Sequence, residues 1–185
     1  LILGCRDSTS KLDSQQKDVF HNIFEMIDKY NLYGKVAYPK KHSPDQIPAL
    51  YRWAASRGGF FVNPALTEPF GLTLLEASSC GLPIISTDDG GPQEIRSKCE
   101  NGLLVDVTDI NQLKIILEKG INNNSQWKLW SRNGIEGVHR HFSWNTHVRN
   151  YLSIITGKYQ KSTMVSSSGI KESCLKGSSS LIKPH

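Results

Sequence analysis

Two glutamates, Glu68 and Glu76, lie eight residues apart and flank a segment that is typical of a tight turn. Pro69 and Gly71 fit poorly inside a strand or a helix, but they suit the point where a strand passes into a helix. The first-turn N–H groups of such a helix have no intrahelical partners and carry about half a unit of positive charge. The segment therefore predicts an anion-binding site.

The positions of the two carboxylates extend this prediction. If the helix begins at Phe70 or Gly71, Glu76 shares a helix face with Thr73, one turn beyond the anion. Glu68 lies on the incoming loop, on the other side of the same opening. Isolated glutamates at this spacing are usually solvated helix charges, but the strand–turn–helix context favours binding. A phosphate between two carboxylates that accept hydrogen bonds from hydroxyls suits a nucleotide-sugar.

Composition and charge exclude several other classes. The net charge of the 185 residues is +5, but residues 158–185 hold five lysines and one glutamate, so residues 1–157 are near +1. A nucleic-acid partner therefore has little support. No apolar run approaches the roughly 20 residues of a membrane helix. The four cysteines are widely spaced without a CxxC pair, which favours reduced thiols in a cytoplasmic protein and no metal site.

Short apolar runs alternate with helical patterns through the first two thirds of the chain. Strands are expected at residues 1–4, 35–38, 60–63, 83–87 and 102–105, with helices near 19–31, 49–56, 72–79 and 93–98. After Asp109 the pattern indicates helices only, around 113–117, 127–138 and 144–155, the last capped by Ser143. This order predicts an α/β fold with a Rossmann-like parallel sheet, helices on both faces, and C-terminal helices.

Residues 1–157 are expected to form one domain, and the Ser- and Lys-rich residues 158–185 a linker or disordered tail. The chain begins without Met in what resembles the middle of a buried strand, so we expect it to be part of a longer protein.

Ligands of such sheets bind at the carboxyl ends of the strands. Three expected loops leave those ends, at residues 39–48, 63–71 and 88–92. Gly90, Gly91 and Pro92 fit either a ligand contact or a simple turn before a helix. His139 and His141 do not share a helix face, which favours surface histidines over a metal pair.

The run from Asn63 to Glu76 resembles the Glu-x7-Glu signature of retaining glycosyltransferases with two Rossmann-like domains, the GT-B fold. The segments Gly81-Leu82-Pro83 and 90–95 are similar to those that follow the signature there. Asn-Pro-Ala-Leu before Glu-Pro-Phe-Gly-Leu-Thr resembles the sucrose-phosphate synthase family, as does the run 28–40. The resemblance spans about residues 1–159 and implies the C-terminal, donor-binding domain of such an enzyme.

The resemblance also implies roles for individual residues. It places the donor diphosphate on the backbone N–H groups of four successive residues, Phe70, Gly71, Leu72 and Thr73. Glu76 would bind the ribose hydroxyls and Glu68, the catalytic residue, a hydroxyl of the transferred sugar. The loop from Tyr38 to His42 would lie near the uracil, and His42 is a weaker candidate for a phosphate contact.

The implied reaction transfers glucose from UDP-glucose to fructose 6-phosphate with retention, which gives sucrose 6-phosphate and UDP without a metal or other cofactor. The acceptor domain, with its catalytic His and an Arg/Lys pair for the diphosphate, would precede Leu1, so this chain alone is expected to be inactive. Four alternatives stay open: sucrose synthase, another nucleotide-sugar transferase, a nucleotide-sugar epimerase with the same fold, and a non-catalytic nucleotide-binding module.

Overall fold

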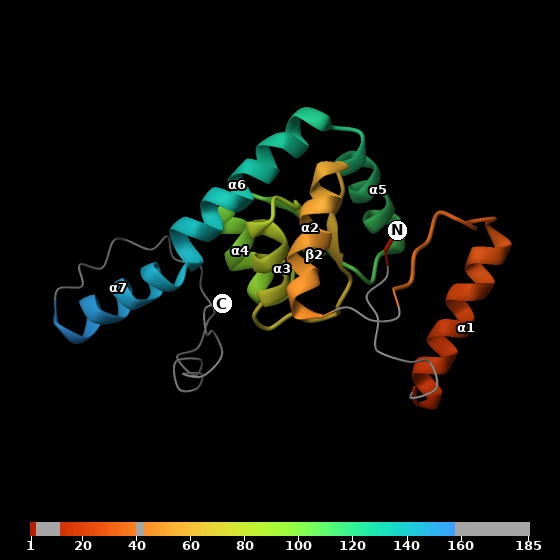
Figure 1. Cartoon of the computed structure of the whole chain (residues 1–185), viewed down its shortest axis with the longest axis horizontal. Coiled ribbons are helices and arrows are strands. Elements are labelled where there is room, and N and C mark those ends of the chain that lie inside the picture. Colours follow the sequence, from red (N-terminus) through yellow and green to blue (C-terminus); the bar gives the residue numbers. More distant parts are fainter. Residues whose placement is uncertain (3–11, 40–42, 158–185) are drawn as a thin grey trace. The chain divides into compact units, whose positions relative to one another are not determined.

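The computed structural model describes residues 1–2, 12–39 and 43–157 of the chain (Figure 1). It divides into two compact units, Leu1–Trp53 and Ala54–His185, and each is described by itself. The predicted tail, residues 158–185, lies outside the described residues, as do residues 40–42 of the loop expected near the uracil. The single domain over residues 1–157 stays a prediction.

Helix α1 (Ser14–Lys29) is the main element of the first unit and begins five residues before the expected helix. Its early start follows from a capping box, in which Gln16 N donates to Asp13 Oδ1 at 2.8 Å and Asp13 N donates back to Gln16 Oε1 at 3.4 Å. A 3-10 turn (Pro44–Gln46) leads into α2 (Ile47–Ser56).

The two expected N-terminal strands are represented by a single parallel bridge between Ile2 and Ala37. Residues 3 and 4 of the first of these strands lie outside the described residues. The ring of Tyr38 packs edge-on against Phe20 of α1, with the centroids 4.7 Å apart. The segment after Ala37 is thus tied to α1.

The second unit contains a three-stranded parallel sheet in the order β1-β2-β3. Its strands are β1 (Phe61–Asn63), β2 (Ile84–Thr87) and β3 (Gly102–Val105). The parallel arrangement confirms the predicted α/β class. All four residues of the central strand β2 are buried. This agrees with the two successive isoleucines at its start, which is typical of a strand covered on both faces.

Helices cover both faces of this sheet. On one face Ile84 of β2 packs with Leu74 of α3 (Leu72–Ser79) and Ile95 of α4 (Gly91–Cys99). The next residue, Ile85, points to the other face, because side chains alternate along a strand. There its Cδ1 lies 3.6 Å from where a Cβ on Gly120 of α5 (Ile110–Ile121) would be.

Helix α6 (Asn124–Phe142) packs against α3 and α4 (Figure 1). Gly137 permits this approach, because a Cβ there would lie 2.7 Å from the Sγ, Cβ and Cα atoms of Cys99. Helix α7 (Trp144–Ile155) begins at the predicted cap, where Thr146 N donates to Ser143 Oγ at 3.3 Å. In the described part of the chain, no helix is both long and apolar enough to cross a membrane.

Cys80 and Cys99 form no disulfide in the described part of the chain, and their surroundings differ. Cys99 is buried in the core between α4 and α6, and burial raises the pKa of its thiol to about 11 against the smaller opposing effect of Lys98. At pH 8 only about one Cys99 thiol in a thousand would be ionised.

We therefore expect iodoacetamide at pH 8 to alkylate half-buried Cys80 at least about tenfold faster than Cys99 in the folded protein. Site-resolved mass spectrometry measures both rates, and the same experiment in denaturant is the control, where the two rates should converge. Equal rates in the folded protein would contradict the packing of α4 against α6.

Candidate functional site

The segment between β1 and α3 forms the predicted turn at the carboxyl end of the sheet. Helix α3 spans Leu72–Ser79, the range expected from the sequence, so it begins one or two residues after the alternative start at Phe70 or Gly71. Gly71 is its N-cap, with a φ of 77°, a left-handed conformation that favours glycine. The site of Gly71 is also crowded, since a Cβ would lie 2.7 Å from Ile95 Cδ1. Both constraints explain a glycine at this position.

The carboxylate of Glu68 is held at both of its oxygens. Gly71 N donates to Oε1 at 2.9 Å, and the side-chain amide of Asn63 donates to Oε2 at 2.9 Å. Glu68 is half-buried. Its negative charge therefore lies at the positive end of α3, where a carboxylate is stabilised. The sequence placed Glu68 beside the opening but did not predict its bond to the amide of Gly71, the N-cap residue of α3.

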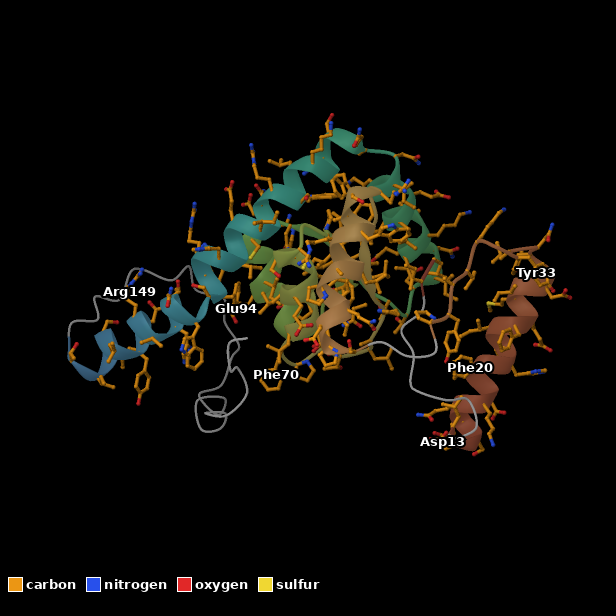
Figure 2. All side chains as sticks on the ribbon, in the orientation of Figure 1. Asp13, Phe20, Tyr33, Phe70, Glu94 and Arg149 are labelled. Atoms are coloured by element: carbon orange, nitrogen blue, oxygen red, sulfur yellow. The ribbon has the colours of Figure 1, made fainter. Side chains whose placement is uncertain are left out.

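The other three amides predicted to bind the diphosphate, those of Phe70, Leu72 and Thr73, do not donate to Glu68. The first backbone bond of α3 runs from Leu75 N to Gly71 O at 3.1 Å, so the amides of Leu72 and Thr73 precede the intrahelical ladder. Both residues are exposed. Phe70 is 71% exposed and projects outward from the ribbon (Figure 2). Of the four predicted amides, that of Gly71 already donates to Glu68.

A second loop, residues 88–90 after β2, supports the turn through the backbone. Glu68 N donates to Asp89 O at 3.3 Å, and Gly91 N donates to Glu68 O at 2.8 Å. Thr67 Oγ1 adds a bond to Asp89 Oδ2 at 2.7 Å. A Cβ on Gly91 would lie 2.5 Å from Phe70 O, so only glycine lets the two loops approach this closely. These contacts give Gly90 and Gly91 a structural role at the site.

Glu76 lies on α3 within one turn of Thr73 and is exposed. Its position on the helix matches the predicted one, three residues after Thr73 and four after Leu72. Glu68 and Glu76 thus bracket the first turn of α3, one on the loop before it and one beyond it. Within the part of the chain that the structure describes, the amides of Leu72 and Thr73 have no hydrogen-bond partner, a geometry that suits an anion. Among the described residues, no group of three or more His, Cys, Asp or Glu side chains could hold a metal ion.

Asn63 also contributes to this site, although the sequence assigned it no role. It ends β1, and its side chain reaches Glu68 five residues later. An asparagine at the carboxyl end of a strand, before a turn with a glutamate, is a signal that could have drawn attention to it.

Two solved structures have a fold similar to that of this chain. The sucrose-phosphate synthase of Thermosynechococcus elongatus superposes with a TM-score of 0.61 at 28% identity, over 78% of this chain and 37% of that one. HepE of Anabaena, solved in complex with UDP, gives a TM-score of 0.68 at 20% identity, over 84% of this chain and 40% of that one. The fold is therefore that of one half of a GT-B glycosyltransferase, as predicted.

The chain belongs to the family of glycosyl transferases group 1, whose model matches residues 1–137. Among curated proteins it is 48% identical over 153 residues to sucrose-phosphate synthase 4 of Arabidopsis thaliana, and 44% identical over 157 residues to the sucrose-phosphate synthase of Zea mays. These matches cover 83% and 85% of this chain but 14% and 15% of the relatives. The chain thus spans about a seventh of the length of these relatives.

The close approach of the two loops can be tested by adding one methyl group. We expect Gly91→Ala to lower the free energy of unfolding by about 1–3 kcal/mol, because the new Cβ meets the carbonyl group of Phe70. The direction of this change in the free energy of unfolding is informative. Without the contact, alanine would stabilise a helix relative to glycine by up to about 1 kcal/mol.

Ser97→Ala, an exposed change in the same helix, is the control for Gly91→Ala and should stay within about 0.5 kcal/mol of the parent. Urea titrations followed by circular dichroism measure both variants. A Gly91→Ala protein as stable as the parent would show that the loops are not packed as described.

Proposed function

We propose that this chain is the donor-binding part of a glycosyltransferase that transfers glucose from UDP-glucose to fructose 6-phosphate, giving sucrose 6-phosphate with retention of configuration. The observation that carries the proposal is the exposed first turn of α3, bracketed by Glu68 and Glu76. The similarity to sucrose-phosphate synthases supports the choice of substrates. HepE, a structural neighbour solved with UDP and with UDP-glucose, supports a uridine nucleotide as donor.

The donor diphosphate would lie at the N-terminus of α3. We assign it to the amides of Phe70, Leu72 and Thr73, with the amide of Gly71 shared with or retained by Glu68. The helix contributes partial positive charge at this end, which suits an anion. Because the bond from the anomeric carbon to the leaving oxygen breaks, negative charge grows on the diphosphate. Fixed amides stabilise that charge without having to reorganise.

The two glutamates would contact neutral parts of the donor. A carboxylate close to a phosphate would be repelled by it, so we assign Glu68 to a hydroxyl of the transferred glucose and Glu76 to the ribose hydroxyls. Glu68 then acts by holding the sugar in the reactive orientation, a contribution of positioning rather than of proton transfer. The site as we assign it needs no metal ion or other cofactor.

The acceptor and the remaining catalytic groups would come from the part of the enzyme that this chain does not contain, since the chain covers only 14–15% of its plant relatives. We extend the proposal to a cytoplasmic enzyme with neither a nucleic-acid nor a membrane partner.

The acceptor assignment is tested on the whole enzyme. Incubation with UDP-glucose and either fructose 6-phosphate or fructose should give a disaccharide phosphate from the first sugar and little product from the second. Preference for fructose would indicate a sucrose synthase, and a changed sugar nucleotide without any acceptor would indicate an epimerase. UDP binding without any product would leave a non-catalytic nucleotide-binding module.

The ribose assignment predicts that Glu76→Ala raises the Kd for UDP at least about tenfold, because a charged hydrogen bond contributes about 1.5–3 kcal/mol. The control is Glu118→Ala, which removes an exposed glutamate from α5 and should leave the Kd unchanged. Isothermal titration of both variants measures the constants. Equal affinities for the Glu76→Ala and Glu118→Ala enzymes would contradict the assignment.

A further inference from the structure

Asn63 is held by the sheet and by two side-chain hydrogen bonds beside the proposed site. It is the last residue of β1, and its backbone is in register with Ser86 of the buried strand β2. Its side chain is half-buried and makes two hydrogen bonds: Nδ2 donates to Glu68 Oε2 at 2.9 Å, and Oδ1 accepts from Ala65 N at 3.1 Å. The amide therefore links the end of the sheet to the carboxylate of Glu68.

The two bonds also fix which way the amide of Asn63 faces. The N–H of Ala65 can only donate, so the atom facing it must be the carbonyl oxygen of Asn63. The NH2 group is then left to face Glu68, where it meets an oxygen that can only accept. The reversed orientation would place two donors together on one side and two acceptors together on the other.

The carboxylate of Glu68 has little freedom as a result. Gly71 N holds Oε1 and Asn63 holds Oε2, so both ends of the carboxylate plane are fixed. Each oxygen keeps one further lone pair that no described group uses, and these lone pairs define where a hydroxyl can be bound. Without Asn63, the single bond to Gly71 would allow the carboxylate to rotate about it.

We propose that Asn63 is a positioning residue, which orients the carboxylate of Glu68 toward the donor sugar. This inference rests on the proposed function, because it needs a sugar hydroxyl for Glu68 to bind. Asn63 itself would not touch the donor. It acts through Glu68, and a displacement of about 1 Å at such a group can cost about a hundredfold in rate.

A purely structural role for Asn63 makes different predictions. If the side chain only tied the turn together through Ala65, its loss would loosen the amides of α3 as well. UDP affinity and turnover would then fall in parallel, whether or not Glu68 is present. The positioning role predicts instead a loss of turnover that depends on Glu68 and leaves UDP affinity largely unchanged.

The test is a double-mutant cycle in the whole enzyme with Asn63→Ala, Glu68→Ala and both changes together. We expect Asn63→Ala to lower kcat at least about tenfold, with the Kd for UDP within about twofold of the parent. In the Glu68→Ala background, the change at Asn63 should lower kcat by less than about twofold. The matched control is Thr67→Val, which removes another side-chain bond of the same turn and should change kcat less than about twofold.

Asn63→Asp is the second variant, for the case in which the alanine variant does not fold. Its carboxylate keeps an acceptor for Ala65 N, so the turn stays tied, but an oxygen replaces the donor that faces Glu68. We expect kcat to fall at least as far as in Asn63→Ala at a pH where both carboxylates are ionised. Thermal unfolding should occur at a lower temperature than in the parent, because two like charges then face each other.

Additive losses of kcat in the cycle, or a parallel loss of UDP affinity, would overturn the positioning role while the proposed function stands. An unaltered kcat in Asn63→Asp would overturn it as well. A parent enzyme that transfers no glucose from UDP-glucose would instead overturn the proposed function, and the inference would fall with it. The activity of the parent therefore separates the two failures.

Discussion

The carboxylate of Glu68 at the N-terminus of α3 is the interaction on which the site depends. Its two oxygens accept from Gly71 N and from Asn63, while its backbone bonds to Asp89 and Gly91 across the neighbouring loop. One residue therefore joins the end of β1, the start of α3 and the loop after β2. Because it already accepts from the amide of Gly71, that amide is less available to another acceptor than those of Leu72 and Thr73.

The rest of the second unit holds this junction in place. Ile84 on the central strand packs with Leu74 and Ile95, so α3 and α4 lie over one face of the sheet and their N-termini meet at its carboxyl edge. Glycine at position 91 then allows backbone contact between the two loops.

Local signals in the sequence predicted much of this architecture. The strand at residues 102–105 and the capped helix at 144–155 have the expected bounds, because apolar runs and caps are local features. Helix α4 begins at Gly91, earlier than expected, since Pro92 is tolerated in the first turn. The bonds from Asn63 and Gly71 to Glu68 could not be predicted, because they depend on how the turn folds back on itself. The roles assigned to Glu68, Glu76 and the amides of the turn stay predictions.

We propose that the first turn of α3 receives the diphosphate of the donor. Hydrogen–deuterium exchange of the whole enzyme, with UDP and with uridine, tests it most directly. We expect UDP to slow exchange in peptides covering residues 68–76, and uridine, which lacks the diphosphate, to slow it much less at the same occupancy. Protection by UDP elsewhere in the protein, with no change in these peptides, would contradict it.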